Sequence, residues 1–188
     1  MCSRGAPRLP IAAAAVVLVL LGLAAPPASR AASPIVAGYP YANRCPAAGV
    51  AEKVDRWKMY VCNCTSYAAW ALSANGQRID WFVPGVMDAK NWARVALRAG
   101  IGVGHTPRVG AVAVWPRESK FGHVAYVTHV DPDGNFDVSE YNLPGDEAKR
   151  FTFDVRREVS SAGAVFVYVP KRAEPRRLLN ARGSRARS

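Results

Sequence analysis

The sequence NCTSYAAWALSANG, residues 63–76, is typical of a single α-helix. It contains no proline, and its one glycine, Gly76, stands where the helix is expected to stop. Asn63 is placed as the N-cap, before the first helical residue. One helical face gathers Cys64, Tyr67, Ala68, Ala71 and Leu72. We therefore predict a helix over residues 64–74 that begins at a cysteine.

The chain that follows predicts a second helix and then a sheet. Apolar residues repeat at three and four over residues 87–99, with Asp88 as a cap and Gly100 as the stop. Beyond Gly100 the period changes to two, and β-branched or aromatic runs are broken by Pro, Gly and Asp. These runs are residues 109–115, 122–130, 135–141, 150–155 and 164–169. Helices followed by a meandering sheet predict an α+β fold with an antiparallel sheet of about five strands.

Residues 1–31 have the features of an export signal. Arg4 and Arg8 precede an uncharged apolar run, and Ser29 and Ala31 provide small residues at cleavage-compatible spacing. The alternative is an uncleaved membrane anchor, but the apolar run is shorter than the ~20 residues that span a bilayer. We predict cleavage after Ala31 and a secreted or cell-wall-associated protein.

The rest of the chain is long enough for one core. Residues 32–56, rich in Pro, Gly and Ala, are predicted to form an extended lead-in, and residues 57–170 the folded domain. Removing residues 1–31 takes away three arginines and no acids, so the formal charge falls from +11 to +8. Residues 171–188 carry seven basic residues and one acid, which predicts a disordered basic tail. A chain of this charge favours polyanions as partners; export points to the anionic polymers and lipids of the cell envelope and argues against nucleic acid.

Three cysteines remain once Cys2 leaves with the signal. Outside the cytoplasm pairing is the default, so an odd count leaves one thiol free. A bridge within Cys62-Asn-Cys64 would be strained, which favours a Cys45–Cys62 disulfide and a free Cys64. A Cys45–Cys64 bridge, which would silence Cys64, remains open.

Cys64 is a candidate nucleophile because the first turn of a helix favours the thiolate. An inert, half-buried cysteine is the competing interpretation. A histidine must serve as base, and His123, at the start of a strand after Gly122, is the best placed. His129 is interpreted as structural and His105 as a loop residue. Glu140 and Asn142 share one strand face by alternation, so both are expected to point toward the strand of His123.

Five motifs, in this order, resemble those of CHAP domains, particularly of Gram-positive exported proteins. They are YVCNCTSYAAW (60–70), AKNWA (89–93), TPRVGAVAVW (106–115), GHVAYV (122–127) and VSEYN (138–142). The resemblance spans about residues 39–169. It implies a papain-like fold and an N-acetylmuramoyl-L-alanine amidase or peptidoglycan endopeptidase. It assigns the nucleophile to Cys64, the base to His123 and the orientation of the base to Glu140 and Asn142.

One residue departs from the family pattern, which usually has glutamine before the nucleophile where this chain has Asn63. If that amide binds the oxyanion, a misplaced donor lowers the rate; if it is only an N-cap, asparagine serves equally. The backbone N–H of Cys64 is an expected oxyanion donor in either case. Trp70, Trp81, Trp92 and Trp115 are candidates for a glycan groove, with the core as the alternative.

Other functional classes fit the sequence less well. A wall-binding protein on an inactive CHAP scaffold is the main alternative. A zinc site formed by Cys62, Cys64, His123 and His129 matches no common ligand spacing. The segment DPDGN at 131–135 lacks the later acid of a calcium loop and is predicted to be a turn. No cofactor, no metal and no stable protein partner is predicted.

Overall fold

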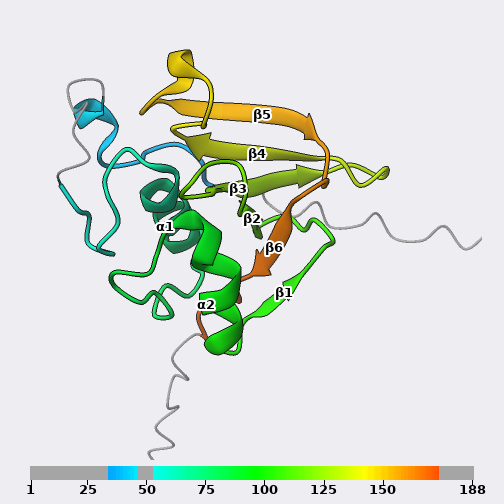
Figure 1. Cartoon of the computed structure of the whole chain (residues 1–188). Coiled ribbons are helices and arrows are strands. Elements are labelled where there is room, and N and C mark those ends of the chain that lie inside the picture. The colour runs from blue at the N-terminus through cyan, green and yellow to red at the C-terminus, as the bar shows by residue number, and fades with distance from the viewer. Residues whose placement is uncertain (1–33, 46–52, 174–188) are drawn as a thin grey trace, which may run out of the picture. The chain divides into compact units, whose positions relative to one another are not determined.

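The computed structural model describes residues 34–45 and 53–173 (Figure 1). All of them fall within one compact unit, Ser33–Ser188. The other unit, Met1–Ala32, and therefore the predicted signal at 1–31, lies outside the described residues. So does the predicted basic tail, apart from residues 171–173. No helix among the described residues is long and apolar enough to cross a membrane.

A six-stranded antiparallel sheet forms the framework, in the order β1-β6-β2-β3-β4-β5. Its strands are β1 (Gly102–Gly104), β2 (Val112–Trp115), β3 (His123–Val130), β4 (Phe136–Tyr141), β5 (Phe153–Val159) and β6 (Val165–Tyr168). The α+β prediction is confirmed, with one strand more than expected. The added strand, β1, pairs with β6 at one edge of the sheet.

The predicted first helix is present with its expected bounds, α1 (Cys64–Ala74). Asn63 has the extended backbone of an N-cap, but its side chain makes no capping hydrogen bond. Gly76 adopts a φ of +71° just past the helix end, as a C-terminal stop requires. The helix packs against β3 and β4, so it brings its first residue, Cys64, toward the part of the sheet that carries His123 and Glu140.

The second helix is shorter than predicted. Residues 87–99 form a 3₁₀ turn, η2 (Ala89–Asn91), followed by α2 (Trp92–Arg98), which ends before Gly100. Asp88 occupies the cap position but makes no side-chain cap. Trp92 is fully buried and anchors this segment to the core. Figure 1 shows α1 beside β3 and α2 beside β6 and β1, with β1 and β5 at the two edges of the sheet.

The lead-in is more ordered than the sequence indicates. Residues 34–45 contain a short 3₁₀ helix, η1 (Ala42–Arg44), and Tyr39 is buried against the rings of Tyr67, Trp70 and Tyr141. Val54 forms a bridge with Tyr60, so regular contacts begin before the predicted start at residue 57. Large aromatic side chains supply this early structure, because a buried ring removes much apolar surface from water.

Candidate active site

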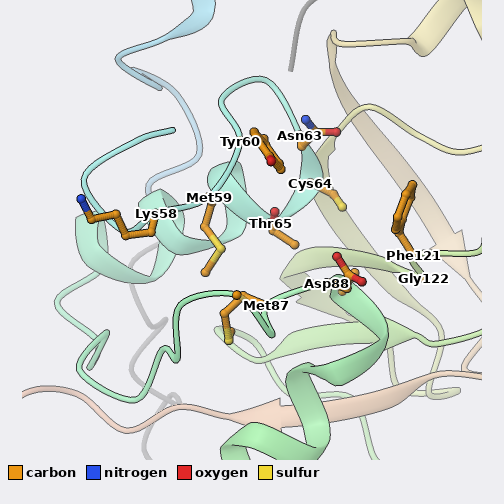
Figure 2. A pocket seen from close by; sticks show the side chains of 12 residues that line it. Lys58, Met59, Tyr60, Asn63, Cys64, Thr65, Met87, Asp88, Phe121 and Gly122 are labelled. Atoms are coloured by element: carbon orange, nitrogen blue, oxygen red, sulfur yellow. The ribbon is translucent and has the colours of Figure 1, made fainter. Parts of the chain in front are cut away.

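Cys64 is the first residue of α1 and lines a cavity of about 510 Å³ (Figure 2). The cavity lies between the loop before α1, the segment before η2 and the turn before β3. Its lining residues are Lys58, Met59, Tyr60, Asn63, Cys64, Thr65, Gly85, Met87, Asp88, Ala89, Phe121 and Gly122. The N–H of Cys64 belongs to the first helical turn, where backbone donors have no acceptor within the helix. Cys64 therefore lines the cavity from the first turn of α1.

Cys45 and Cys62 form the expected disulfide, with their Cα atoms 5.3 Å apart. Cys64 is a free, buried thiol. The structure thus resolves the pairing that the sequence left open, and Cys64 remains available for chemistry.

A buried hydrogen-bond network braces the loop before Cys64. The Tyr39 hydroxyl accepts from the backbone N–H of Cys62 at 3.0 Å and lies 2.6 Å from Ser66 Oγ. Ser66 in turn donates to Asp55 Oδ2 at 2.6 Å, so Tyr39 must give its own proton to Ser66. Burial raises the pKa of Tyr39 to about 12, which keeps this donor protonated. Sequence reasoning missed Tyr39 because its partners lie far along the chain. It missed Asp55 because the backbone groups that bind this carboxylate lie two or more residues away in an irregular loop.

His123 is the first residue of β3 and is fully buried. Its Nε2 atom lies 2.6 Å from Glu140 Oε2. Gly122, with a φ of +75°, places the start of β3 against η2: a Cβ on Gly122 would lie 2.5 Å from the backbone nitrogen of Lys90. Sequence analysis predicted both the position of His123 and its glutamate partner.

The second ring nitrogen of His123 is left for Cys64. Nδ1 is buried and makes no hydrogen bond of standard geometry to any described residue. Burial disfavours the charged ring, but the charge of a Cys64 thiolate, contact with its sulfur and Glu140 together raise the pKa of His123 to about 9. The charged form of the His123 ring is therefore favoured at neutral pH.

Glu140 lies fully buried in β4 and is ionised by its neighbours. Burial alone would raise the pKa of this carboxyl, but hydrogen bonds from His123 and Arg156 outweigh burial and lower that pKa. Because the carboxylate only accepts, His123 Nε2 carries the proton and donates it. Arg156, on β5, was missed because the predicted strand over residues 150–155 ended one residue before it. Its signal was alternation: Asp154 and Arg156 share the inward parity of β5.

Asn142 does not extend the strand alternation that was expected to aim it at His123. Strand β4 ends at Tyr141, and Asn142 has a φ of +54°. Its Nδ2 donates to Asn63 Oδ1 at 2.7 Å, and its Oδ1 accepts from the N–H of Phe151 at 3.0 Å. Asn63 Nδ2 makes one long contact, 3.4 Å to the carbonyl oxygen of Val61. The structure thus brings Asn142 to the residue that precedes Cys64.

The tryptophans expected in a groove lie elsewhere among the described residues. Trp81, Trp92 and Trp115 are buried in the core, and Trp70 packs on Tyr39. The exposed aromatics beside Cys64 are instead Tyr60, 56% exposed, and Phe121, 54% exposed, and both line the cavity. Figure 2 shows Phe121 beside Cys64 and Tyr60 on the loop before it.

The residues of the weighed zinc set do not converge. Cys62 is in the disulfide, and His129 lies on the exposed end of β3, 3.0 Å from Asp131 Oδ1. Among the described residues no group of three or more His, Cys, Asp or Glu could hold a metal ion.

Comparison with known proteins gives a family and a fold. Residues 54–142 match the family model of the CHAP domain. "Staphylococcal secretory antigen ssaA2" of Staphylococcus aureus (strain NCTC 8325 / PS 47) is 46% identical over 55 residues, 29% of this chain and 20% of the relative. The same antigen of strain MRSA252 matches with equal identity and coverage. The matched segment thus spans about a fifth of the length of these curated relatives.

A solved structure, an N-acetylmuramoyl-L-alanine amidase from Staphylococcus aureus, superposes with a TM-score of 0.52 at 22% identity. The superposition covers 64% of this chain and 34% of that one, and at this identity it speaks for the fold. The expected fold is confirmed by this likeness, with α1 packed on an antiparallel sheet. Residues 54–142, which hold Cys64, His123, Glu140 and Asn142, are the part of this chain that matches the CHAP-domain family model.

Proposed function

We propose that this protein is an exported cysteine hydrolase that cleaves amide bonds in bacterial peptidoglycan, as an N-acetylmuramoyl-L-alanine amidase or an endopeptidase. One observation carries the proposal: a free Cys64 opens on a cavity while a buried His123–Glu140 pair leaves one ring nitrogen for it. The CHAP match and the amidase fold likeness support the same reaction class.

The reaction begins with attack of the Cys64 thiolate on an amide carbonyl. The carbonyl oxygen gains negative charge, and we assign the N–H of Cys64 and the amide of Asn63 as the donors that stabilise it. His123 then gives its Nδ1 proton to the departing amine, and a thioester remains on Cys64. Water, deprotonated by His123, attacks the thioester, releases the carboxylic acid and restores the thiolate. Glu140 keeps the ring oriented throughout.

The cavity suits a peptide strand laid across Cys64. Met59 and Met87 give it an apolar floor, and Tyr60 and Phe121 supply exposed rings. Thioether and aromatic side chains adapt to irregular apolar surfaces, so they favour the short side chains of a wall peptide. We therefore place the substrate against these residues and not against the buried tryptophans.

Export and wall attachment are part of the proposal. The disulfide favours an oxidising compartment, and the matched relatives are named secretory antigens. The basic residues at 171–188 provide charge complementary to anionic wall polymers. Peptidoglycan is thus the proposed substrate and the anionic wall the proposed partner.

The decisive experiment compares the protein with Cys64→Ala on purified peptidoglycan, under mild reduction that spares the Cys45–Cys62 bridge. We expect release of new amino groups by the wild type and a loss of at least about 10³-fold in the variant, because no other side chain replaces the nucleophile. The identity of the exposed amine distinguishes amidase from endopeptidase. If both proteins bind several wall types and neither releases an amine, the protein is a wall-binding module.

A further inference from the structure

We propose that Arg156 is a positioning residue of this site, which keeps Glu140 ionised and aimed at His123. Arg156 belongs to none of the five motifs and does not line the cavity. The activity readout of this inference rests on the proposed function, while its chemical readout on Cys64 does not.

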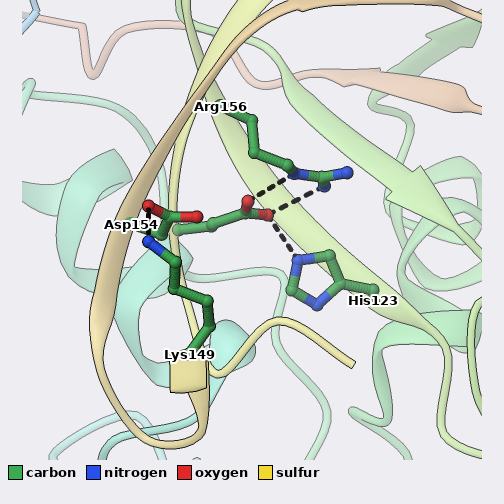
Figure 3. Close-up of polar contacts among 5 residues, drawn as sticks. His123, Lys149, Asp154 and Arg156 are labelled. Atoms are coloured by element: carbon green, nitrogen blue, oxygen red, sulfur yellow. Dashed lines mark hydrogen bonds and ion pairs between the residues drawn. The ribbon is translucent and has the colours of Figure 1, made fainter. Parts of the chain in front are cut away.

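Glu140 is a carboxylate with no access to solvent, so every lone pair must be satisfied by the protein. Arg156 donates through Nε to Oε1 and through Nη2 to Oε2, the latter at 2.9 Å. His123 donates to the same Oε2 atom at 2.6 Å. Figure 3 shows Arg156 and His123 reaching one carboxylate from two sides. This bidentate hydrogen bonding by the guanidinium fixes the plane of the carboxylate, whereas a single hydrogen bond would leave the carboxylate free to rotate.

Trp115 fixes the other side of this arrangement. It is the register partner of His123 across β2 and β3, and its ring stacks on the imidazole at 6.0 Å with an interplanar angle of 29°. The Arg156 guanidinium lies 5.0 Å from the centroid of the same indole ring. Trp115 therefore packs against both the imidazole of His123 and the guanidinium of Arg156. The guanidinium is held by the Glu140 carboxylate and by the indole ring of Trp115.

The other charges around Glu140 do not replace Arg156. Asp154 is its register partner on β5, and Lys149 from η3 (Glu147–Lys149) pairs with Asp154 at 2.8 Å. Burial, with a smaller contribution from the Glu140 charge, raises the pKa of Tyr67 from α1, so this group stays neutral. Because Lys149 is committed to Asp154, the cation in contact with Glu140 among the described residues, besides His123, is Arg156.

Loss of Arg156 therefore has a defined sign. Without its two donors the buried Glu140 protonates at higher pH, because burial disfavours the carboxylate. A protonated Glu140 no longer stabilises the charged ring of His123, so less thiolate forms on Cys64 at acid pH. In pH–rate profiles of both activity and Cys64 alkylation, the acid limb, where the rate falls as the pH is lowered, should then move to higher pH.

The test measures the rate of Cys64 alkylation by iodoacetamide from pH 4 to 9 in the full chain, and kcat and KM on peptidoglycan, for three variants. Arg156→Gln removes the charge and the fork; Arg156→Lys keeps the charge only. Arg157→Gln is the matched control, since Arg157 points to the opposite side of β5, is 75% exposed and pairs with Asp137 at 3.0 Å. Circular dichroism checks that each variant folds.

We expect Arg156→Gln to lower kcat about 10- to 100-fold with little change in KM, and to shift the acid limb of alkylation upward, as misplacement of a catalytic group predicts. Arg156→Lys should fall between it and the wild type, and Arg157→Gln should match the wild type. Acid limbs that coincide for Arg156→Gln and Arg157→Gln would overturn the proposal. If Arg156→Gln does not fold, Arg156→Lys decides, and a wild-type profile in that variant overturns it. If the acid limb of alkylation shifts as expected but neither the wild type nor any variant hydrolyses the wall, the proposed function is rejected and the inference on Arg156 is retained.

Discussion

At the residue scale, the charge of His123 is set by the groups that surround its ring. Its ordinary pKa is ~6.5, whereas Cys64 and Glu140 raise the pKa of His123 here to about 9 despite burial. A raised histidine pKa means that the charged ring stabilises the folded state. This stabilisation is fully present at a pH below the ordinary histidine pKa and is lost as the pH rises through about 9. Activity should follow the same charge, because the ring must donate a proton to the leaving amine.

We therefore predict that kcat/KM stays high through neutral pH and falls with an alkaline midpoint near pH 9. The check is a pH–rate profile, together with NMR titration of the His123 ring in the protein. In Glu140→Gln the midpoint should move down, because the carboxylate is one of the charges that favour the imidazolium. If the His123 ring of the wild type titrates near the ordinary histidine pKa, Cys64 and Glu140 do not stabilise its charged form.

Sequence motifs located some residues of the site and not others for a physical reason. Cys64, His123 and Glu140 were found because each lies in a local motif whose spacing fixes its place on a helix or strand. Arg156 was missed because its contact to Glu140 depends on how β5 pairs with β4, and that pairing shifts register between Phe136 and Val138. A shift of this kind re-aims side chains without leaving a mark in the motif.

At the element scale, the site depends on how closely β3 approaches η2. Lys90 donates its backbone N–H to the carbonyl of Phe121 at 2.9 Å, and Gly122 follows directly. A Cβ on Gly122 would meet the Lys90 backbone at 2.5 Å. Backbone cannot rotate away as a side chain can, so any larger residue must separate the two elements and displace His123.

Gly122→Ala should therefore lower the free energy of unfolding by about 2–4 kcal/mol, through the contact and the left-handed backbone together. Gly134→Ala is the matched control: its φ is +85°, but a Cβ there meets nothing within 4 Å. It should cost only about 1 kcal/mol, the penalty of the left-handed conformation. Chemical denaturation measures both. Equal losses in the two variants would show that the approach of β3 to η2 is not tight.

The elements themselves were predictable where a period was long and unbroken. Helix α1 has eleven residues on one apolar pattern, and its bounds were predicted. Strand β1, Gly-Val-Gly, has too few side chains to show alternation, and it forms because β6 offers an unpaired edge. The second helix was overextended because its first residues form a 3₁₀ turn, which shares the apolar spacing of an α-helix over so short a run.

At the scale of the whole molecule, residues 34–45 are attached without belonging to the sheet. Their attachments are the Tyr39 network, hydrogen bonds between Ile35 and Asn75, and the Cys45–Cys62 disulfide. All of them end on α1, on the residues that follow it or on the loop before it. Composition indicated an irregular lead-in, but no local pattern could show that this segment braces the loop of Cys64, because its partners are 17 to 40 residues away.

Removal of the disulfide by Cys45→Ala with Cys62→Ala should lower the free energy of unfolding by about 3 kcal/mol, since the bond closes a loop of 17 residues. Denaturant midpoints of this variant and of the reduced wild type should agree. Release of the segment also frees Tyr39 from the N–H of Cys62, so we expect slower Cys64 alkylation even where the variant is fully folded. Tyr39→Phe is the companion variant: it keeps the disulfide and the ring but loses the hydroxyl. If Tyr39→Phe leaves alkylation unchanged while loss of the disulfide slows it, the covalent bond alone holds the loop. If both slow it, the segment acts as a brace through its hydrogen bonds as well.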